Sequence, residues 1–522
     1  MKENHIKKTG SLCPECLKIL DAELFERDGK VWIRKKCLEH GEFSDLYYGD
    51  YEMYKRAMKW AHDGKGIDNP ATEFRACPMD CGLCDAHKSH TALANTVVTN
   101  RCDLACFYCF FYAKAMGYLY EPTLPQIRLM FKNLRQERPV ATNAIQLTGG
   151  EPTIREDIVD IVRVAKEEGF DHVQLNTNGI RMSQNPELVK MLRSAGVNTL
   201  YLSFDGVTAK TNPKNHWEIP RLFRNVRETG MGVVLVPTVI NGVNDHELGD
   251  IIRFGIRNLD IVRGVNFQPV SLVGRITKAD REKFRITIPD AIKRIEEQTN
   301  GEIARDDWYP VPTVTAITHF IEALSGRGRY ELTAHPVCGM ATYVFMDNGK
   351  PVPITRFVDV DGMMEYLNEK ADDIKGGRSK LLVGAEMLFK LKSFIDSKRQ
   401  PKDLNLANIL FNIFKNRDYG SLRELQHKSL FLGMMHFQDL YNYDIERVKR
   451  CCIHYSQPDG TIVPFCAFNV IPQWYRDKVQ RRFSSSIEDW EKATGKKLSD
   501  DFYKRDEKKL ESEPIYKETY SK

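Results

Sequence analysis

The chain has 522 residues, 42% of them hydrophobic, which is enough for more than one domain with its own core. Its net charge of +5 is mild, so a solvated basic surface explains it better than a nucleic-acid partner. The N-terminal residues contain no apolar segment, and no stretch approaches the roughly 18 apolar residues that a spanning helix requires. We therefore predict a cytoplasmic protein that is not integral to a membrane and makes at most peripheral contact with one.

Thirteen cysteines are grouped at short spacings, which indicates metal ligation in a reducing compartment and argues against disulfides. The first group lies in residues 1–50, on both sides of a predicted hairpin. Three thiolates and one imidazole predict a tetrahedral mononuclear site that closes a module too small for an adequate core. Zinc is the generic ion for this donor set, whereas a rubredoxin-like iron would add an electron-transfer role, and both stay open. The predicted ligands are Cys13, Cys16, Cys37 and His40.

Two Cys-x3-Cys-x2-Cys motifs follow this module. Each spacing brings three thiolates onto one small turn, which is enough to hold three irons of a cubane and leaves the fourth iron open. The first motif lies in a linker, residues 51–90, and the second follows the strand-like segment ALANTVVT. No further cysteine follows the second motif until Cys338, so the open iron can take an exogenous chelator. The motifs consist of Cys77, Cys81 and Cys84, and of Cys102, Cys106 and Cys109.

Residues 91–280 alternate between strand-like and helical segments. The strand-like runs are NAIQLTG, HVQLNTNG, TLYLSFDG, GVVLVPTVI and VNFQPVS, and amphipathic helical stretches separate them. This alternation predicts an α/β fold with a parallel sheet and ligand sites at the carboxyl ends of the strands. About six such units fit into the span, which favours a partial (β/α)6 barrel over a closed barrel of eight units.

Polar motifs end three of these strands: TGGEPT, NTNG and SFDG. In series with the second cysteine triad, and with an aromatic residue before its last cysteine, they resemble the radical S-adenosylmethionine (SAM) superfamily. The resemblance implies that the Cys102 triad holds the SAM-binding [4Fe-4S] cluster. The Cys77 triad, which follows a polar loop and has Leu83 in place of the aromatic residue, is then auxiliary. A zinc site or a simple ferredoxin site is the alternative. The residues implied to bind SAM are Tyr108, Gly149, Gly150, Glu151, Asn176, Thr177, Asn178, Ser203 and Asp205.

Residues 281–522 are predicted to form an α+β auxiliary-cluster domain. Two segments, CGMATYVFMDNGKPVPITRF and CCIHYSQPDGTIVPFC, predict similar hairpins, and each resembles half of a SPASM-type domain. In the first, Thr355 or a neighbour stands where a second cysteine belongs. Seven cysteines remain for auxiliary clusters, too few to ligate two cubanes fully, so one site has another ligand or an open iron, or only one cluster exists. We assign a second auxiliary cluster to Cys338, Cys451, Cys452 and Cys466.

An apolar insertion at about residues 379–447 is rich in Leu, Met and Phe at helical spacing, followed by SLFLGMMHF. Two interpretations stay open for it. Its helices bury their faces against one another, or they line a long hydrophobic channel beside a radical site.

The combination of these modules over nearly the whole chain resembles the tetraether lipid synthases. The resemblance implies coupling of terminal methyl carbons of isoprenoid chains of archaeol-type phospholipids by a 5′-deoxyadenosyl radical. It also implies a ferredoxin-like electron donor, and Arg263 and Arg275 are candidate headgroup contacts. One alternative is a radical SAM methyltransferase of 7,8-dihydro-6-hydroxymethylpterin, which gives no reason for the apolar insertion. Others are an iron-sulfur electron carrier that never turns SAM over and a peptide-modifying maturase.

Overall fold

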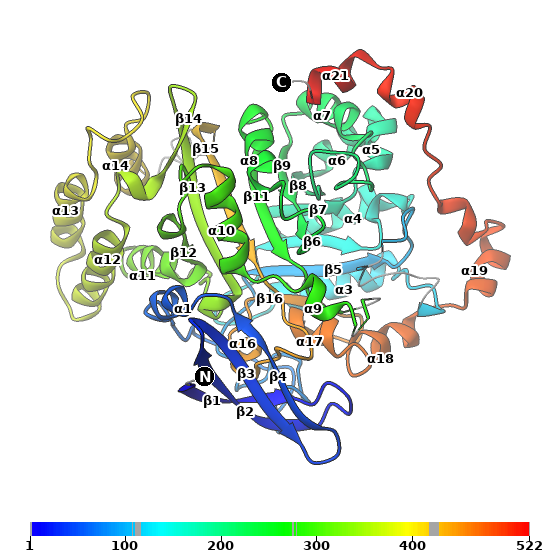
Figure 1. Ribbon diagram of the computed structural model, residues 1–522, viewed down its shortest axis with the longest axis horizontal. Helices are drawn as coiled ribbons and strands as arrows, with labels where there is room; N and C mark the ends of the chain where they lie inside the picture. Colours follow the sequence, from blue (N-terminus) through cyan, green and yellow to red (C-terminus); the bar gives the residue numbers. More distant parts are fainter. Residues whose placement is uncertain are drawn as a thin grey trace.

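The structure is a computed structural model that describes residues 3–106, 108–109, 116–273, 276–277, 279–416 and 427–520. Its centre is a 13-stranded sheet (Figure 1). The middle of this sheet is six parallel strands joined through helices, which confirms the predicted partial (β/α)6 barrel. The six strands are β5 (Leu93–Thr99), β6 (Ala144–Gly149), β7 (His172–Thr177), β8 (Val197–Ser203), β9 (Gly232–Val236) and β11 (Val262–Pro269).

Helices cover one face of the parallel strands. Alternate strand residues, such as Ile145 and Leu147 in β6, are aliphatic and join the main core with the apolar faces of these helices. The first of them begins at Thr123, whose side chain forms a capping box with Gln126. The helices are α3 (Leu124–Arg135), α4 (Ile158–Glu167), α5 (Ile180–Gln184), α6 (Pro186–Ala195), α7 (Ile219–Arg227), α8 (Leu248–Arg257) and α10 (Ile288–Gln298).

The N-terminal module is a separate four-stranded antiparallel sheet. The hairpin of its second and third strands turns at Asp28 and Gly29, which both have positive φ. The module docks on the C-terminal part of the chain, since Lys35 Nζ donates to the Leu440 carbonyl oxygen at 2.6 Å and Ser11 Oγ donates to that of Tyr443 at 2.6 Å. Its elements are β1 (Asn4–Leu12), β2 (Ile19–Arg27), β3 (Lys30–Cys37) and β4 (Gly41–Tyr48), and α1 (Tyr51–Met58) follows.

Strands from the last 200 residues extend the same sheet at both edges, an arrangement visible in Figure 1. β16 (Ile453–Ser456) runs parallel to β5, and β15 (Ser429–Met435) runs parallel to β11. The two predicted hairpins are confirmed: β13 (Gly339–Asp347) pairs with β14 (Lys350–Pro353), and β16 pairs with β17 (Ile462–Pro464). The predicted domain boundaries themselves stay a prediction. The remaining strands are β10 (Thr238–Val239) and β12 (Tyr309–Pro310).

The described part of the apolar insertion packs against itself and its neighbours. Val383 and Met387 join a small core with α11 and α12, Ile395 and Ile409 join another, and Met434 lies in β15 within the main core. These side chains are therefore core, as in the first of the two interpretations; residues 417–426 lie outside the described residues. The helices are α11 (Thr315–Ser325), α12 (Val360–Lys375), α13 (Lys380–Lys390) and α14 (Leu406–Asn416).

The C-terminal segment runs along the side of the barrel up to α7 (Figure 1). Trp217 Nε1 donates to Glu511 at 2.8 Å, and Arg505 Nε pairs with Glu218 at 2.8 Å. Within the described residues, no helix has the length and apolar character needed to cross a bilayer. The short helices of this region and its surroundings are α9 (Arg281–Phe284), α16 (Ile445–Lys449), α17 (Phe465–Val470), α18 (Arg476–Gln480), α19 (Ile487–Thr494), α20 (Glu507–Glu511) and α21 (Pro514–Tyr520).

A buried carboxyl group ties the end of α3 to the start of β5. Glu137 is 4% exposed and accepts hydrogen bonds from the hydroxyls of Thr91 and Thr142, both at 2.6 Å. Burial raises the pKa of Glu137 to about 7, because the two hydroxyls offset only part of the lost hydration. The folded state therefore binds this proton more tightly than the unfolded chain.

The substitution Glu137→Gln tests this linkage. The contribution of Glu137 to stability is complete below the unfolded pKa of 4.5 and is lost as the pH rises through about 7. We expect the variant to lose less stability than the wild type between about pH 4.5 and pH 7.5, by up to about 3 kcal/mol. Anaerobic thermal unfolding over this range measures it. Glu488→Gln, at an exposed site, is the control; equal pH profiles for wild type and Glu137→Gln would contradict the assignment.

Candidate active site and metal centres

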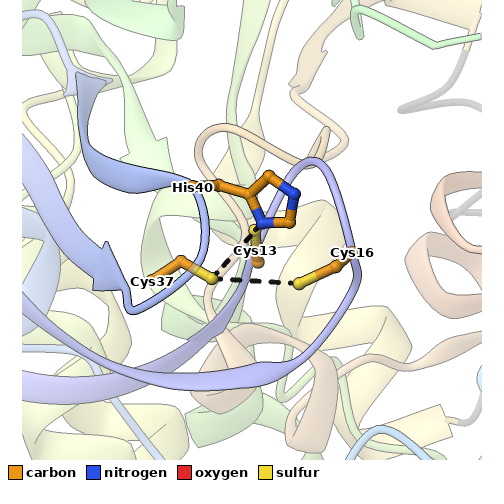
Figure 2. A group of neighbouring side chains, drawn as sticks. All are labelled: Cys13, Cys16, Cys37 and His40. Carbon is orange, nitrogen blue, oxygen red and sulfur yellow. Dashed lines mark hydrogen bonds between the residues drawn. The ribbon is translucent and has the colours of Figure 1, made fainter.

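The four predicted ligands of the N-terminal module meet at one point (Figure 2). Their ligand atoms all lie within 4.8 Å of one another, with 3.5 Å between Cys37 Sγ and His40 Nδ1 and 3.9 Å between Cys16 Sγ and Cys37 Sγ. The hydrogen bond with His40, helped by backbone amides, lowers the pKa of Cys37 to about 6, so a thiolate forms readily. This donor set fits a tetrahedral Zn²⁺ or Fe²⁺ ion.

The Gly-Gly-Glu turn after β6 lies against the chain that leads to Cys102. A Cβ atom on Gly149 would stand 2.0 Å from the Thr99 carbonyl oxygen, and one on Gly150 would stand 1.9 Å from that of Arg101. The close approach allows two backbone bonds of 2.8 Å, from Gly150 N to Thr99 O and from Glu151 N to Arg101 O. Only glycine fits both positions, and the two strand ends are locked together as a result.

The Glu151 carboxylate joins the ends of β6 and β7. It is 1% exposed and accepts the Thr177 hydroxyl at 2.8 Å and the Asn178 backbone N–H at 2.7 Å, besides two bonds from Thr153. The Asn178 side chain in turn donates to Asp103 at 2.6 Å, within the cysteine loop. Asn176 donates to Thr148 at 3.0 Å. These predicted SAM-site residues therefore form one network with the loop.

The predicted residues of β8 surround a lysine that the sequence analysis missed. Lys214 Nζ lies 2.7 Å from Asp205 Oδ2 and donates to Ser203 Oγ at 2.6 Å. The same Asp205 oxygen accepts the Tyr108 hydroxyl at 2.5 Å, and the ammonium lies 5.3 Å from the centroid of the Tyr108 ring. A basic residue soon after a strand end was the available sequence signal.

The Cys102 triad occupies the loop between these two networks. Burial raises the pKa of the Cys102 and Cys106 thiols, and the nearby Lys214 charge partly offsets this for Cys106. Buried thiols become thiolates when cationic iron replaces their protons, so the donor set fits a cluster. The Cys109 backbone N–H donates to the Cys106 carbonyl oxygen at 3.3 Å. Residues 107 and 110–115 of this loop lie outside the described residues.

The auxiliary cysteines gather near the β16–β17 hairpin. Cys77, Cys81 and Cys84 line a small cavity together with Pro464 of β17. Burial, and then the charges of Cys81, Cys77 and Cys466, raise the pKa of Tyr443. Cys338 Sγ accepts Arg447 Nε at 3.2 Å, from a guanidinium that is only 2% exposed. Their division between two clusters stays a prediction.

Opposite the helices, the face formed by β6, β7, β8 and β11 is mainly polar, whereas β9 contributes Val234 and Val236 to it. Gln174 donates to Gln146 at 2.7 Å, and the Tyr201 hydroxyl accepts bonds from Asn266 and, at 3.4 Å, from Gln268. Eight polar side chains lie on this face, and the sequence analysis assigned only Asn176 and Ser203 of them to the SAM site. Polar residues at alternate positions of β6, β7, β8 and β11 were the signal for the others. We call this surface the polar inner face: Gln146, Thr148, Gln174, Asn176, Tyr201, Ser203, Asn266 and Gln268.

The C-terminal segment also reaches the cysteine loop. Arg101, next to Cys102, forms a two-point ion pair with Asp501 at 2.7 and 3.0 Å, and Tyr503 N donates to the Asp103 carbonyl oxygen at 3.1 Å. Arg263, by contrast, lies at the amino end of β11, where it donates to the carbonyl oxygens of Leu259 and Asp260. Its predicted place at the barrel mouth is therefore wrong, and Arg275 lies outside the described residues.

Comparison with known proteins decides the family. Residues 96–255 match the Radical SAM superfamily, and residues 5–49 match the HMPTM N-terminal zinc ribbon domain. The chain is 47% identical over 500 residues to a 7,8-dihydro-6-hydroxymethylpterin dimethyltransferase of Methanocaldococcus jannaschii, which covers 93% of this chain and 97% of that one. The chain belongs to the same radical SAM family as that protein. It is a radical SAM enzyme with SAM and a [4Fe-4S] cluster as cofactors, and its zinc ribbon fits an additional metal site.

Two further similarities are more distant. The GTP 3′,8-cyclase of Clostridium acetobutylicum is 27% identical over 256 residues, which cover 47% of this chain and 74% of that relative. The crystal structure of a radical SAM methyltransferase from Sphaerobacter thermophilus covers 57% of this chain and 74% of its own at 14% identity. Its TM-score is 0.27.

The predicted kinship with tetraether lipid synthases is wrong, because the full-length relative is named as a pterin-modifying enzyme. The predicted carbon-carbon coupling reaction and the predicted isoprenoid phospholipid substrate are wrong for the same reason. The apolar insertion favoured the lipid prediction over the pterin, because a run of Leu, Met and Phe has the same sequence pattern whether it lines a channel or fills a core. In the described residues part of it fills cores, whereas Leu381, Leu382 and Phe389 of α13 are exposed.

The substitution Gly150→Ala tests the locked turn. Its Cβ atom would overlap the Arg101 carbonyl oxygen, so residues 101–103 must move away from β6. We expect SAM affinity to fall by at least about tenfold, or about 1.4 kcal/mol, while the metal of the zinc ribbon is retained. Anaerobic equilibrium dialysis with SAM measures it. Gly328→Ala is the control, because its nearest neighbour is Val140 at an ordinary 3.5 Å; an unchanged SAM affinity in Gly150→Ala would contradict the role of the turn.

Proposed function

We propose that this radical SAM enzyme is a methyltransferase whose substrate is 7,8-dihydro-6-hydroxymethylpterin or a close relative of it. The observation that carries the proposal is the 47% identity to a dimethyltransferase of this pterin, which extends over 93% of this chain and 97% of the relative. An identity that spans the zinc ribbon, the barrel and the C-terminal strands supports a shared substrate better than a match to the barrel alone.

The polar inner face supports a polar, planar substrate. A pterin ring carries hydrogen-bond donors and acceptors along its edge, and the side chains of Gln146, Gln174 and Gln268 offer both kinds of partner. A hydrocarbon chain against the same surface would leave their remaining donors and acceptors without partners, at about 1–3 kcal/mol for each buried group. The face therefore favours the pterin over an apolar substrate.

The SAM-site residues keep their predicted roles as part of this proposal. When bound, the cluster and SAM supply the radical chemistry. The Gly-Gly-Glu turn offers backbone groups to the amino end of SAM, and Glu151 fixes the ends of β6 and β7 beneath it. Lys214 neutralises Asp205, which orients the Tyr108 hydroxyl beside the cysteine loop. The buried guanidinium of Arg447 compensates negative charge at Cys338, one of the proposed auxiliary ligands.

The deciding experiment offers the reconstituted enzyme two substrates separately. Under anaerobic conditions with a chemical reductant and SAM, we expect 7,8-dihydro-6-hydroxymethylpterin to gain methyl groups. For each methyl group, one SAM would act as methyl donor and leave as S-adenosylhomocysteine, and a second, cleaved with electrons from the reductant, would give methionine and 5′-deoxyadenosine in step with product. GTP, the substrate named for the partial relative, should give no product. Mass spectrometry of both mixtures provides the measurement. Conversion of GTP without methylation of the pterin would overturn the proposal.

The variant Gln268→Ala tests the polar inner face as the pterin site. Among the described residues, its side-chain amide makes one long bond of 3.4 Å to Tyr201 and so has capacity for a ligand. Loss of one neutral hydrogen bond corresponds to about 1 kcal/mol, so we expect KM for the pterin to rise about fivefold with SAM binding unchanged. Asn143→Ala is the matched control, because Asn143 precedes β6 at the opposite end of the barrel. An equal effect of both variants on KM would place the substrate elsewhere.

A further inference from the structure

A second group of metal-ligand side chains lies outside every predicted site. It consists of His62, which follows α1, His319 of α11, and Glu331 in the loop before β13. Their ligand atoms all lie within 4.8 Å of one another. Among the described residues, this group and the Cys3His group are the two with such geometry. Three separate parts of the chain therefore converge on one small volume.

The Lys65 backbone and the His319 ring hold the carboxylate of Glu331 in place. Glu331 is only 2% exposed, and its Oε2 accepts the Lys65 backbone N–H at 3.1 Å, while Oε1 faces His319 Nε2 at 3.2 Å. Burial opposes ionisation, but the hydrogen bond with His319 and the Lys65 charge and amide outweigh it and lower the pKa of Glu331 to about 2. The group is a carboxylate at neutral pH, with one oxygen oriented by its neighbours as in many metal sites.

The two histidines complete a two-histidine, one-carboxylate set. Their rings meet edge to face with centroids 4.8 Å apart. Ligand atoms around a tetrahedral zinc ion lie about 3.4 Å apart, given zinc-ligand distances of about 2.1 Å. His319 and Glu331 already satisfy this spacing, and the exposed His62 side chain has to approach by at most about 1.5 Å.

The Lys65 ammonium group and the proton between His319 and Glu331 are the positive charges that a metal ion at this site would replace. Lys65 Nζ lies 3.6 Å from Glu331 Oε1, but it also forms a closer ion pair with Glu322, which holds it when Glu331 binds another cation. His319 shares a proton with Glu331, and a metal ion takes the place of that proton. Asp63, beside His62, already forms ion pairs with Arg450 at 2.6 Å and Lys88 at 3.1 Å, so it does not compete with Glu331 for a metal ion.

We propose that His62, His319 and Glu331 bind a divalent first-row transition-metal ion of the Zn²⁺ class, with water in the open position. Imidazole and carboxylate ligands suit this class, and the set contains no thiolate that would hold an iron-sulfur cluster. The ion would fasten the linker between the zinc ribbon and the Cys77 triad to α11 and to the segment that leads into Cys338. It is a third kind of metal site in this chain, and it does not rest on the proposed function.

The test is a metal count on the full-length enzyme with its clusters and ribbon metal in place. The enzyme is exposed anaerobically to excess Zn²⁺, passed over a desalting column, and analysed for zinc and iron by mass spectrometry. We expect the wild type to retain one zinc ion more than His62→Ala, at equal iron content. His62 is partly exposed, and its ring nitrogens have no hydrogen-bond partner among the described residues, so this variant should fold normally. Glu331→Gln should lose the same ion.

His246→Ala is the matched control, because His246 is an exposed histidine 3.9 Å from Glu247 that belongs, among the described residues, to neither group with metal-site geometry. It should retain as much zinc as the wild type. Zinc-edge X-ray absorption of the additional ion should give nitrogen and oxygen ligands at about 2.0–2.1 Å. Equal zinc in wild type and His62→Ala, or sulfur ligands at about 2.3 Å around the additional ion, would overturn the proposal.

Discussion

The close contact between the Gly-Gly-Glu turn and the end of β5 is the constraint on which the rest of the site depends. Two carbonyl oxygens, of Thr99 and Arg101, occupy the space where side chains of Gly149 and Gly150 would stand. Because the Arg101 carbonyl accepts Glu151 N–H, the residue before Cys102 is fixed by the neighbouring strand. The cysteine loop thus begins from a rigid point, and Glu151 passes the same constraint on to β7.

The character of the polar inner face, the proposed pterin site, follows from strand alternation. The residues that pack on the helices are aliphatic, whereas those between them on β6, β7 and β8 include amides and hydroxyls that bond across neighbouring strands. Buried amides are tolerated when they bond with one another or with a polar ligand, and an apolar ligand would leave them unpaired. The rejection of a lipid substrate rests on the pterin-modifying relative, and this surface agrees with it.

The sheet edges explain how distant cysteines meet. β15 and β16 come from the last third of the chain and add to the two edges of the parallel sheet, beside β11 and β5. The hairpin that begins after Cys452 thereby lies beside the Cys77 triad, and the N-terminal module packs on the loop that contains Tyr443. The zinc ribbon and the auxiliary cysteines consequently share one side of the molecule.

The sequence by itself determined what is local. Ligand spacing fixed the Cys3His site, strand and helix periodicity fixed the partial barrel, and turn residues fixed both C-terminal hairpins, because each depends on neighbours within a few residues. Only the tertiary structure decided the rest. The placement of Lys214 between Ser203 and Asp205, the ion pair of Arg101 with Asp501, and the meeting of His62, His319 and Glu331 join residues from different elements. The apolar insertion shows the same limit, because composition shows that a residue is apolar but not what its side chain packs against.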